Sequence, residues 1–111
     1  MTIQRGQGKI AVMFDDMIST AGSICGAAKL VHQAGAKEIQ IAAIHGVLCG
    51  PAIENIRSAP VSSLAVANTI PLPSAEVLPN LVPLSVGRLL AEAIKRIHHD
   101  QSISEMFKSR V

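Results

Sequence analysis

The feature that most restricts the fold of this chain is an apolar run, Ile10 to Phe14, that leads directly into two adjacent carboxylates, Asp15 and Asp16. A short run of small residues, 20–23, follows and marks the start of a helix. Unbroken apolar runs of this length are typical of strands that are buried on both faces of a parallel sheet. The sequence therefore predicts a buried strand, an acidic strand end and a helix start in close succession.

The residues between this strand and helix suit a phosphorylated sugar. A helix start presents unpaired backbone N–H groups and the positive end of the helix dipole, which stabilise a phosphate. Gly22 lets the backbone approach the anion closely, and the hydroxyls of Thr20 and Ser23 add donors. Asp15 and Asp16 can accept hydrogen bonds from sugar hydroxyls or help to hold a divalent cation. A ribose 5-phosphate meets both requirements, although an acidic pair before a Thr-capped helix is also ordinary turn chemistry.

The rest of the chain alternates predicted strands and helices. The expected strands are 9–15, 38–44, 64–68 and 81–85, and the expected helices are 20–34, 52–57 and 86–99. Gly35 stands where a helix end favours a left-handed residue, and Pro71 and Pro73 begin a loop that runs to residue 80. This alternation predicts an α/β fold with a parallel, doubly wound sheet, whose right-handed crossovers bring the loop 15–23 to the C-terminal edge.

The composition excludes several classes of partner. Hydrophobic residues make up 49% of the 111 residues. The mean hydropathy of +0.38 indicates either surface that packs against a partner or a missing half, or a well-packed α/β core alone. The net charge of +2 comes without a basic stripe interleaved with aromatic residues, so we expect no nucleic-acid partner. No leader or 18-residue apolar run is present, so we expect a soluble cytoplasmic protein without a membrane partner.

Cysteine and histidine give no expected metal site. Cys25 and Cys49 are too few and too far apart for a disulfide framework, and we expect both to act as small apolar residues in a reducing compartment. His98 and His99 end a helix, where adjacent side chains chelate poorly. His45 follows a predicted strand and is expected at the ligand edge of the sheet, where it either contacts ligand or a subunit interface or has a structural role.

Several motifs, in one order, resemble the ribose-phosphate pyrophosphokinase (PRPP synthetase) family, which has the type I phosphoribosyltransferase fold. The segment 12–23 resembles the PRPP-binding loop of that fold. The other matching segments are 45–48 with 50–53, the Thr-Ile-Pro of 68–71, the helix 90–98 and the tail 102–107. The resemblance implies one half-domain with a Rossmann-like parallel sheet and flanking helices at 9–107, between a loose N-terminus at 1–8 and a tail at 108–111.

The resemblance implies an activity and its substrates. Enzymes of this family transfer a diphosphoryl group from ATP to ribose 5-phosphate, giving PRPP and AMP with Mg²⁺. The residues carried over for ribose 5-phosphate are Asp15, Asp16, Ser19, Thr20, Ala21, Gly22 and Ser23, with Mg²⁺ held by Asp15 and Asp16 through the ribose hydroxyls. The ATP-binding residues and the catalytic loop of the longer family members have no counterpart here. We therefore assign no catalytic residue, expect no activity from the chain alone, and expect ATP through a missing portion or a partner subunit.

Two further details concern the loop and the tail. The family loop reads Asp-Asp-Met-x-Asp-Thr, whereas this chain has Ser19 in place of the third acid, which weakens the case for full sugar binding. Ser102, Ser104 and Phe107 match positions that in similar enzymes form an allosteric nucleotide site between subunits. By composition alone, this tail is typical of a frayed terminus.

The sequence leaves two other functions open and predicts one kind of assembly. A different phosphoribosyltransferase, such as a purine salvage enzyme, would share the loop, but the Thr-Ile-Pro and Ser-x-Ser-x-x-Phe motifs argue against it. A non-catalytic module that associates with or regulates a synthetase is favoured by Ser19 and by the missing upstream residues. We expect a homo-oligomer, joined near Phe107 or along an uncovered sheet edge, because so small a half-domain leaves apolar surface uncovered.

Overall fold

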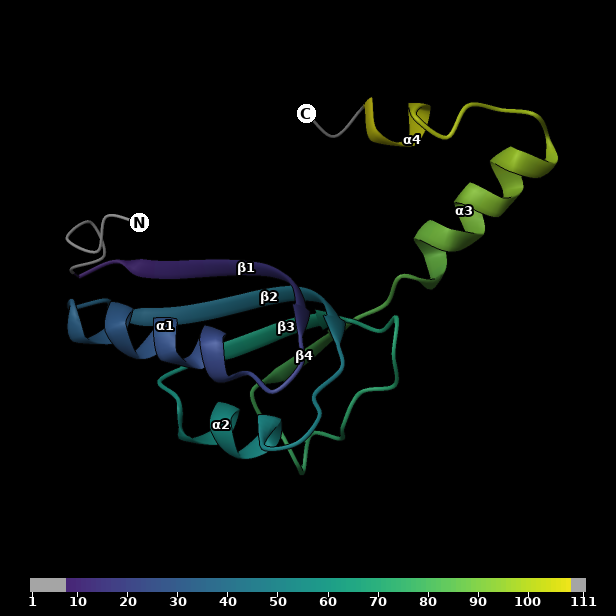
Figure 1. Cartoon of the computed structure of the whole chain (residues 1–111). Helices are drawn as coiled ribbons and strands as arrows, with labels where there is room; N and C mark the ends of the chain where they lie inside the picture. Colours follow the sequence, from purple (N-terminus) through teal and green to yellow (C-terminus); the bar gives the residue numbers. More distant parts are fainter. Residues whose placement is uncertain (1–7, 109–111) are drawn as a thin grey trace.

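The computed structural model describes residues 8–108, and the expectations for 1–7 and 109–111 lie outside the described residues. A parallel sheet of four strands in the order β1-β2-β3-β4 forms the body of the fold (Figure 1). The strands are β1 (Ile10–Ile18), β2 (Glu38–Gly46), β3 (Ser63–Ala67) and β4 (Leu81–Leu84). The helices are α1 (Gly22–Gln33), α2 (Ala52–Ser58), α3 (Gly87–His98) and α4 (Glu105–Lys108). The predicted α/β half-domain with a parallel sheet is therefore confirmed.

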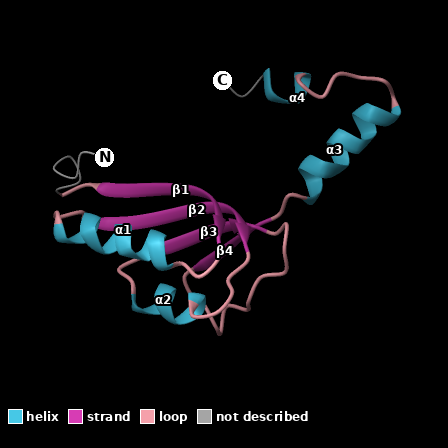
Figure 2. Cartoon of the chain, in the orientation of Figure 1, coloured by secondary structure: helices cyan, strands magenta, loops and turns pink. Residues whose placement is uncertain are grey.

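The doubly wound arrangement expected from the sequence is wrong. Strands in sequential order, joined by right-handed crossovers, place every connecting helix on the same side of the sheet. The described part of the chain shows this result, because α1 and α2 lie on one side of the sheet (Figure 2). A doubly wound sheet requires the strand order to reverse, and this order does not.

The core lies between the sheet and the two helices that cover it. The covered face contributes Ile39, Ile41, Leu64 and Val66, and the register pairs Ile41 with Leu64. The helices contribute small or medium side chains: Cys25, Ala28, Val31, Ala52 and Ile56. Because Ala28 and Ala52 have no exposed surface, the helices sit close on the sheet, as expected for a core built without large aromatic residues.

The other face of the sheet has no helix over it in the described residues. We call it the open face, and its exposed apolar side chains are Ile10, Val12, Phe14, Ile44, Val82 and Leu84. Phe14 is 79% exposed, so the expectation that residues 10–14 are buried on both faces is wrong. Successive strand residues point to opposite faces, and only Ala11 and Met13 of this run pack on the core.

The helix α3 is formed as predicted but does not pack on the sheet. It has no buried residue between Gly87 and His98, and it projects away from the sheet (Figure 1). The radius of gyration is 16.6 Å, whereas a compact domain of this length has roughly 13 Å. The direction in which the chain leaves β4 toward α3 is fixed by a hydrogen bond from the Val86 N–H to Asn68 Oδ1 at 2.9 Å. The apolar surface that the sequence predicts to lack cover therefore includes one face of α3.

We predict opposite effects on stability for two glycine substitutions. A Cβ on Gly46 would lie 2.9 Å from Val66 Cγ1 and 3.0 Å from Leu72 Cδ2, so Gly46→Ala should destabilise the fold by about 1–3 kcal/mol through overpacking. A Cβ on Gly26 in α1 would have no neighbour within 4 Å, so Gly26→Ala should stabilise it by about 0.5–1 kcal/mol. Urea unfolding measures both, and equal midpoints for the two variants would contradict this packing.

Candidate functional site

A small cavity of about 150 Å³ lies at the C-terminal end of β1, where the chain turns into α1. It is lined by Asp15, Met17, Ile18, Ser19, Thr20, Ala21, Gly22, Ser23 and Ile24. All the residues predicted to bind ribose 5-phosphate, apart from Asp16, therefore line this one cavity. Its position agrees with the edge at which parallel sheets of this kind bind ligands.

The start of α1 gives this cavity its polarity. Ala21 adopts a left-handed conformation with φ 67° and ψ 8°, and its carbonyl accepts the first helical bond from the Cys25 N–H at 3.0 Å. The helix therefore begins at Gly22, two residues after the predicted start at Thr20. Within residues 8–108, the N–H groups of 22–24 have no backbone acceptor, and no side chain caps this end. Free amides at a helix start can bind an anion.

Neighbouring segments hold the loop from outside. The Cys49 N–H donates to the Ser19 carbonyl at 2.9 Å, which ties the turn after β2 to the loop. Asn55 of α2 donates from Nδ2 to the Thr20 carbonyl at 2.9 Å. Sequence reasoning missed Asn55, because a polar residue in a short helix carries no local signal of a contact made 35 residues away. These bonds fix the backbone so that its amides stay directed at the cavity.

The two carboxylates are not equivalent. The chain is still in β1 at Asp15 and Asp16, because the strand continues to pair with β2 as far as Ile18 and Gly46. Asp15 lines the cavity, and its Oδ1 accepts the Asp16 N–H at 2.8 Å. Both acids also line a depression on the open face, and Asp16 lines only that depression. Of the predicted pair, only Asp15 is therefore at the sugar-phosphate cavity.

The Thr-Ile-Pro segment meets the end of β2 at the same edge of the sheet. His45 Nδ1 and Thr69 Oγ1 are 2.7 Å apart, and Thr69 Oγ1 donates to the Ile44 carbonyl at 3.4 Å. His45 is exposed but does not line the cavity. The structure thus gives His45 a structural partner, and its contact with a ligand stays a prediction.

Two of the three residues of the predicted tail site lie side by side. The Ser102 and Ser104 hydroxyls are 2.7 Å apart, and Arg96 Nη1 donates to the Ser102 carbonyl at 3.0 Å. Arg96 also pairs with Glu92, one helical turn earlier, at 3.1 Å. Phe107 is exposed in α4, a short helix that sequence reasoning did not predict. A depression between α3 and α4 is lined by Arg88, Glu92, Arg96 and Met106, among others, and not by the two serines or Phe107.

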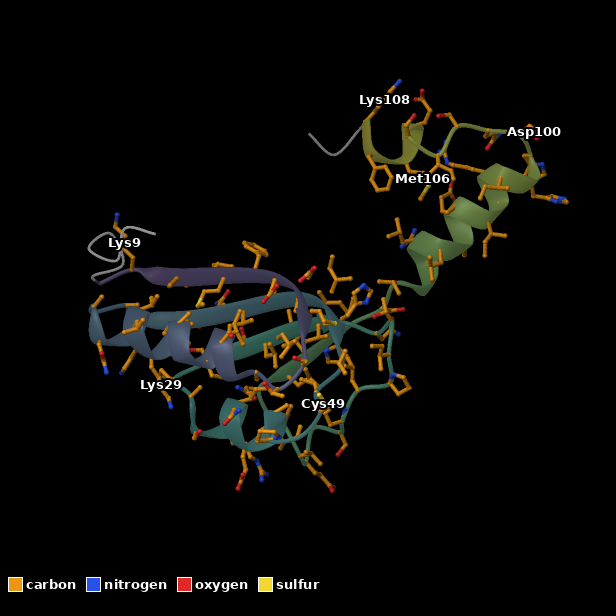
Figure 3. All side chains as sticks on the ribbon, viewed as in Figure 1. Lys9, Lys29, Cys49, Asp100, Met106 and Lys108 are labelled. Atoms are coloured by element: carbon orange, nitrogen blue, oxygen red, sulfur yellow. The ribbon has the colours of Figure 1, made fainter. Side chains whose placement is uncertain are left out.

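The two cysteines near the cavity have different environments. Cys25 is buried in the second turn of α1, and burial raises the pKa of its thiol, opposed by the charge of Lys29. Cys49 is exposed in the turn after β2 (Figure 3), so the expectation that it acts as a small apolar residue is wrong.

We predict that iodoacetamide modifies Cys49 and spares Cys25 in the folded chain at about pH 8, because the thiolate is the reactive form. The raised pKa of Cys25 also makes the fold lose stability as the pH rises through the ordinary thiol value, since the unfolded chain then releases a proton that the folded chain keeps. Mass spectrometry of labelled peptides measures both sites, with urea-unfolded protein as the control. Equal labelling before and after unfolding would contradict the burial of Cys25.

Comparisons with known proteins place this geometry among the synthetases. The sequence matches the phosphoribosyl synthetase-associated domain over residues 2–108. It is 72% identical over 104 residues to a ribose-phosphate pyrophosphokinase of Rhodopirellula baltica, covering 94% of this chain and 33% of the relative. It is 46% identical over 101 residues to that of Bacillus subtilis, covering 91% of this chain and 32% of the relative.

A solved structure gives the same result. The crystal structure of phosphoribosylpyrophosphate synthetase from Mycobacterium smegmatis superimposes with a TM-score of 0.81 at 38% identity. The match covers 86% of this chain and 32% of that chain. The resemblance found in the sequence motifs is therefore confirmed, and the chain spans about a third of the length of the relatives it matches.

Proposed function

Because this chain belongs to the phosphoribosyl synthetase-associated domain family, we propose that it forms the part of a ribose-phosphate pyrophosphokinase that binds ribose 5-phosphate or PRPP. The single observation that carries this proposal is the cavity at the end of β1, which is lined both by a carboxylate and by the free amides of a helix start. The enzyme itself converts ATP and ribose 5-phosphate into PRPP and AMP.

Each part of the cavity has a role in this proposal. The 5-phosphate binds the amides of Gly22 and Ser23 at the start of α1, with the Thr20 and Ser23 hydroxyls as further donors. The carboxylate of Asp15 accepts hydrogen bonds from the ribose hydroxyls. Ser19 and Ala21 complete the wall, and the bond from Asn55 to the Thr20 carbonyl holds the loop in place.

Mg²⁺ fits this site only with help from the substrate. Residues 8–108 contain no group of three or more His, Cys, Asp or Glu side chains able to hold a metal. Mg²⁺ is commonly bound through one or two carboxylates together with substrate oxygens and water, and Asp15 and Asp16 supply such carboxylates. When bound, Mg²⁺ neutralises charge that develops on the transferring phosphoryl group.

We propose that the chain alone has no synthetase activity. Phosphoryl transfer depends on positioning and on cationic stabilisation of the spreading charge. The loop 15–23 contains no lysine or arginine. ATP and its cationic partners therefore come from another portion of the enzyme or from a partner subunit.

The remaining parts of the proposal concern the tail, the assembly and the compartment. Ser102, Ser104 and Phe107 would bind a regulatory nucleotide at a contact between subunits of a homo-oligomer, and their exposure leaves them accessible to that nucleotide.

We place the protein in the cytoplasm, where its two free thiols stay reduced. None of the helices within residues 8–108 is long and apolar enough to cross a membrane.

A non-catalytic module that binds a complete synthetase is the second candidate. Two features of the loop 15–23 favour this role: Ser19 stands in place of the third acid, and no lysine or arginine is present. The first weakens sugar binding, and the second removes the positive charge that phosphoryl transfer needs. Co-purification with an intact synthetase, together with a changed nucleotide response of that enzyme, would favour this role over substrate binding.

Asp15→Asn should weaken binding of ribose 5-phosphate by about tenfold, since a charged acceptor to the ribose hydroxyls is lost. Asp100→Asn is the matched control: it makes the same chemical change at an exposed position outside the cavity and should leave the affinity unchanged. Isothermal titration with ribose 5-phosphate and Mg²⁺ measures both. Equal affinities for the two variants would contradict the site, and AMP formation by the chain alone would contradict the proposed inactivity.

Ser19→Asp should strengthen binding of ribose 5-phosphate in the presence of Mg²⁺, because it restores the acid that the family loop carries at this position. We expect about a tenfold gain, as is typical of a charged hydrogen bond. Ser74→Asp, at an exposed position away from the cavity, adds the same charge and should change nothing. A gain of the same size in both variants would show that net charge, and not the loop, is responsible.

A further inference from the structure

Three consecutive carbonyls of the loop at the cavity, those of residues 18–20, accept hydrogen bonds from one neighbouring segment. Backbone N–H groups of the turn after β2 hold the first two carbonyls, at 3.1 and 2.9 Å. The Thr20 carbonyl is held instead by a side chain, because Nδ2 of Asn55 in α2 donates to it at 2.9 Å. Of these three peptides, the one between Thr20 and Ala21 therefore depends on a side chain for its orientation.

The orientation of this peptide decides where the Ala21 N–H points. In a trans peptide the carbonyl and the N–H lie on opposite sides, and no peptide bond within residues 8–108 is cis. A Thr20 carbonyl that points to Asn55 therefore directs the Ala21 N–H away from α2. The cavity lies on that other side, because its walls come from the end of β1 and the start of α1. The Ala21 N–H has no acceptor in the described part of the chain, so it adds a donor to the free amides of the helix start.

The backbone of Ala21 is strained in this orientation. Its φ of 67° lies in the left-handed region, which residues other than glycine rarely adopt. Rotating the peptide between Thr20 and Ala21 by half a turn would return Ala21 to a negative φ and relieve the strain. The same rotation would direct the Thr20 carbonyl at the cavity, where this acceptor would face phosphate oxygens that are acceptors themselves. The orientation of one peptide thus decides whether the cavity presents a donor or an acceptor.

Asn55 holds the donor orientation from a rigid support. Ala52 and Ile56 of α2 are buried in the core, so they fix this helix on the sheet. The Asn55 side chain is half-buried, which limits competition from water for its bond to the Thr20 carbonyl. Without this bond, the carbonyl would lack its partner and the strain at Ala21 would favour the rotated peptide.

We propose that Asn55 is a positioning residue of the phosphate cavity, and that it selects the donor orientation of a two-state peptide between Thr20 and Ala21. Asn55 does not line the cavity and acts through this peptide. A bound phosphate favours the same orientation, so the phosphate and the bond from Asn55 strengthen each other. The role of Asn55 in binding rests on the proposed function, whereas the orientation of the peptide can be measured without a ligand.

Nuclear magnetic resonance measures this orientation in the ligand-free chain. At positive φ, the N–H and Hα hydrogens of a residue lie close together and give a strong nuclear Overhauser effect. We expect the strong effect at Ala21 in the unmodified chain. It should be lost in Asn55→Leu and in Asn55→Asp, because both variants keep a branched side chain of similar shape but remove the donor. Gln33→Leu, which exchanges an exposed amide at the end of α1, is the matched control and should leave Ala21 unchanged.

Isothermal titration with ribose 5-phosphate and Mg²⁺ measures the consequence for binding. Asn55→Leu should raise the Kd by about tenfold, because only the chains with the donor orientation are competent to bind. Gln33→Leu should leave the Kd unchanged. Adding Ala21→Gly to Asn55→Leu should recover at least about threefold of the loss, since glycine adopts a positive φ without strain. A general loss of stability in Asn55→Leu would not be recovered by a glycine at this position.

Two results would overturn the proposal. A strong effect at Ala21 that persists in both Asn55 variants would show that this side chain does not select the orientation. A change of orientation at Ala21 without a change in the Kd would show that binding does not depend on this peptide. Loss of the effect in the Asn55 variants, with no binding of ribose 5-phosphate by the unmodified chain, would support the orienting role of Asn55 and refute the proposed function.

Discussion

The constraint on which this structure depends is that parallel strands in sequential order take their crossovers on one side. Each connecting helix follows a right-twisted strand, and the crossover to the next parallel strand is right-handed. Every such helix therefore lies over the same face of the sheet. The helices α1 and α2 can therefore build a core with Ile41 and Leu64 on one face, while no element between the strands is left to cover the other. The open face is a consequence of strand order.

The same constraint positions the candidate site. Parallel strands end at one edge, so the turn from β1 into α1 lies beside the turn after β2 and the start of α2. The bonds from Cys49 to Ser19 and from Asn55 to Thr20 follow from this proximity. They hold a loop whose left-handed residue, Ala21, is not glycine, and residues in such conformations are retained where the surroundings fix them. A rigid loop keeps free amides directed at a ligand without first losing flexibility.

The position of the acidic pair links the cavity to the open face. Asp15 lines both the cavity and the depression on the open face, and its neighbour Asp16 lines only the depression. Whatever covers the open face therefore lies next to the carboxylate proposed to bind ribose. Removing water from one side of Asp15 strengthens its hydrogen bonds and its attraction for cations. The open face and the cavity thus share one side chain, Asp15.

The sequence by itself determined the elements and the chemistry of the loop. Apolar periodicity and local turn residues are short-range signals, so the strands around Ile41 and Leu64 and the left-handed Gly35 were predictable. The family of the chain could also be inferred, because its motifs occur in one order over nearly the whole length.

The tertiary structure alone decided which surfaces are covered. The sequence of an unbroken apolar run such as 10–14 is typical of a strand buried on both faces. Burial depends on what packs against the strand, however, and no helix within residues 8–108 lies over Phe14. The alternation of side chains along β1 kept Asp16 out of the cavity that Asp15 lines, and pairing with β2 carried the strand past both acids. The outward path of α3 depends on the bond between Val86 and Asn68, a contact between residues distant in sequence. Such contacts leave no local pattern, because they arise only when separate elements meet.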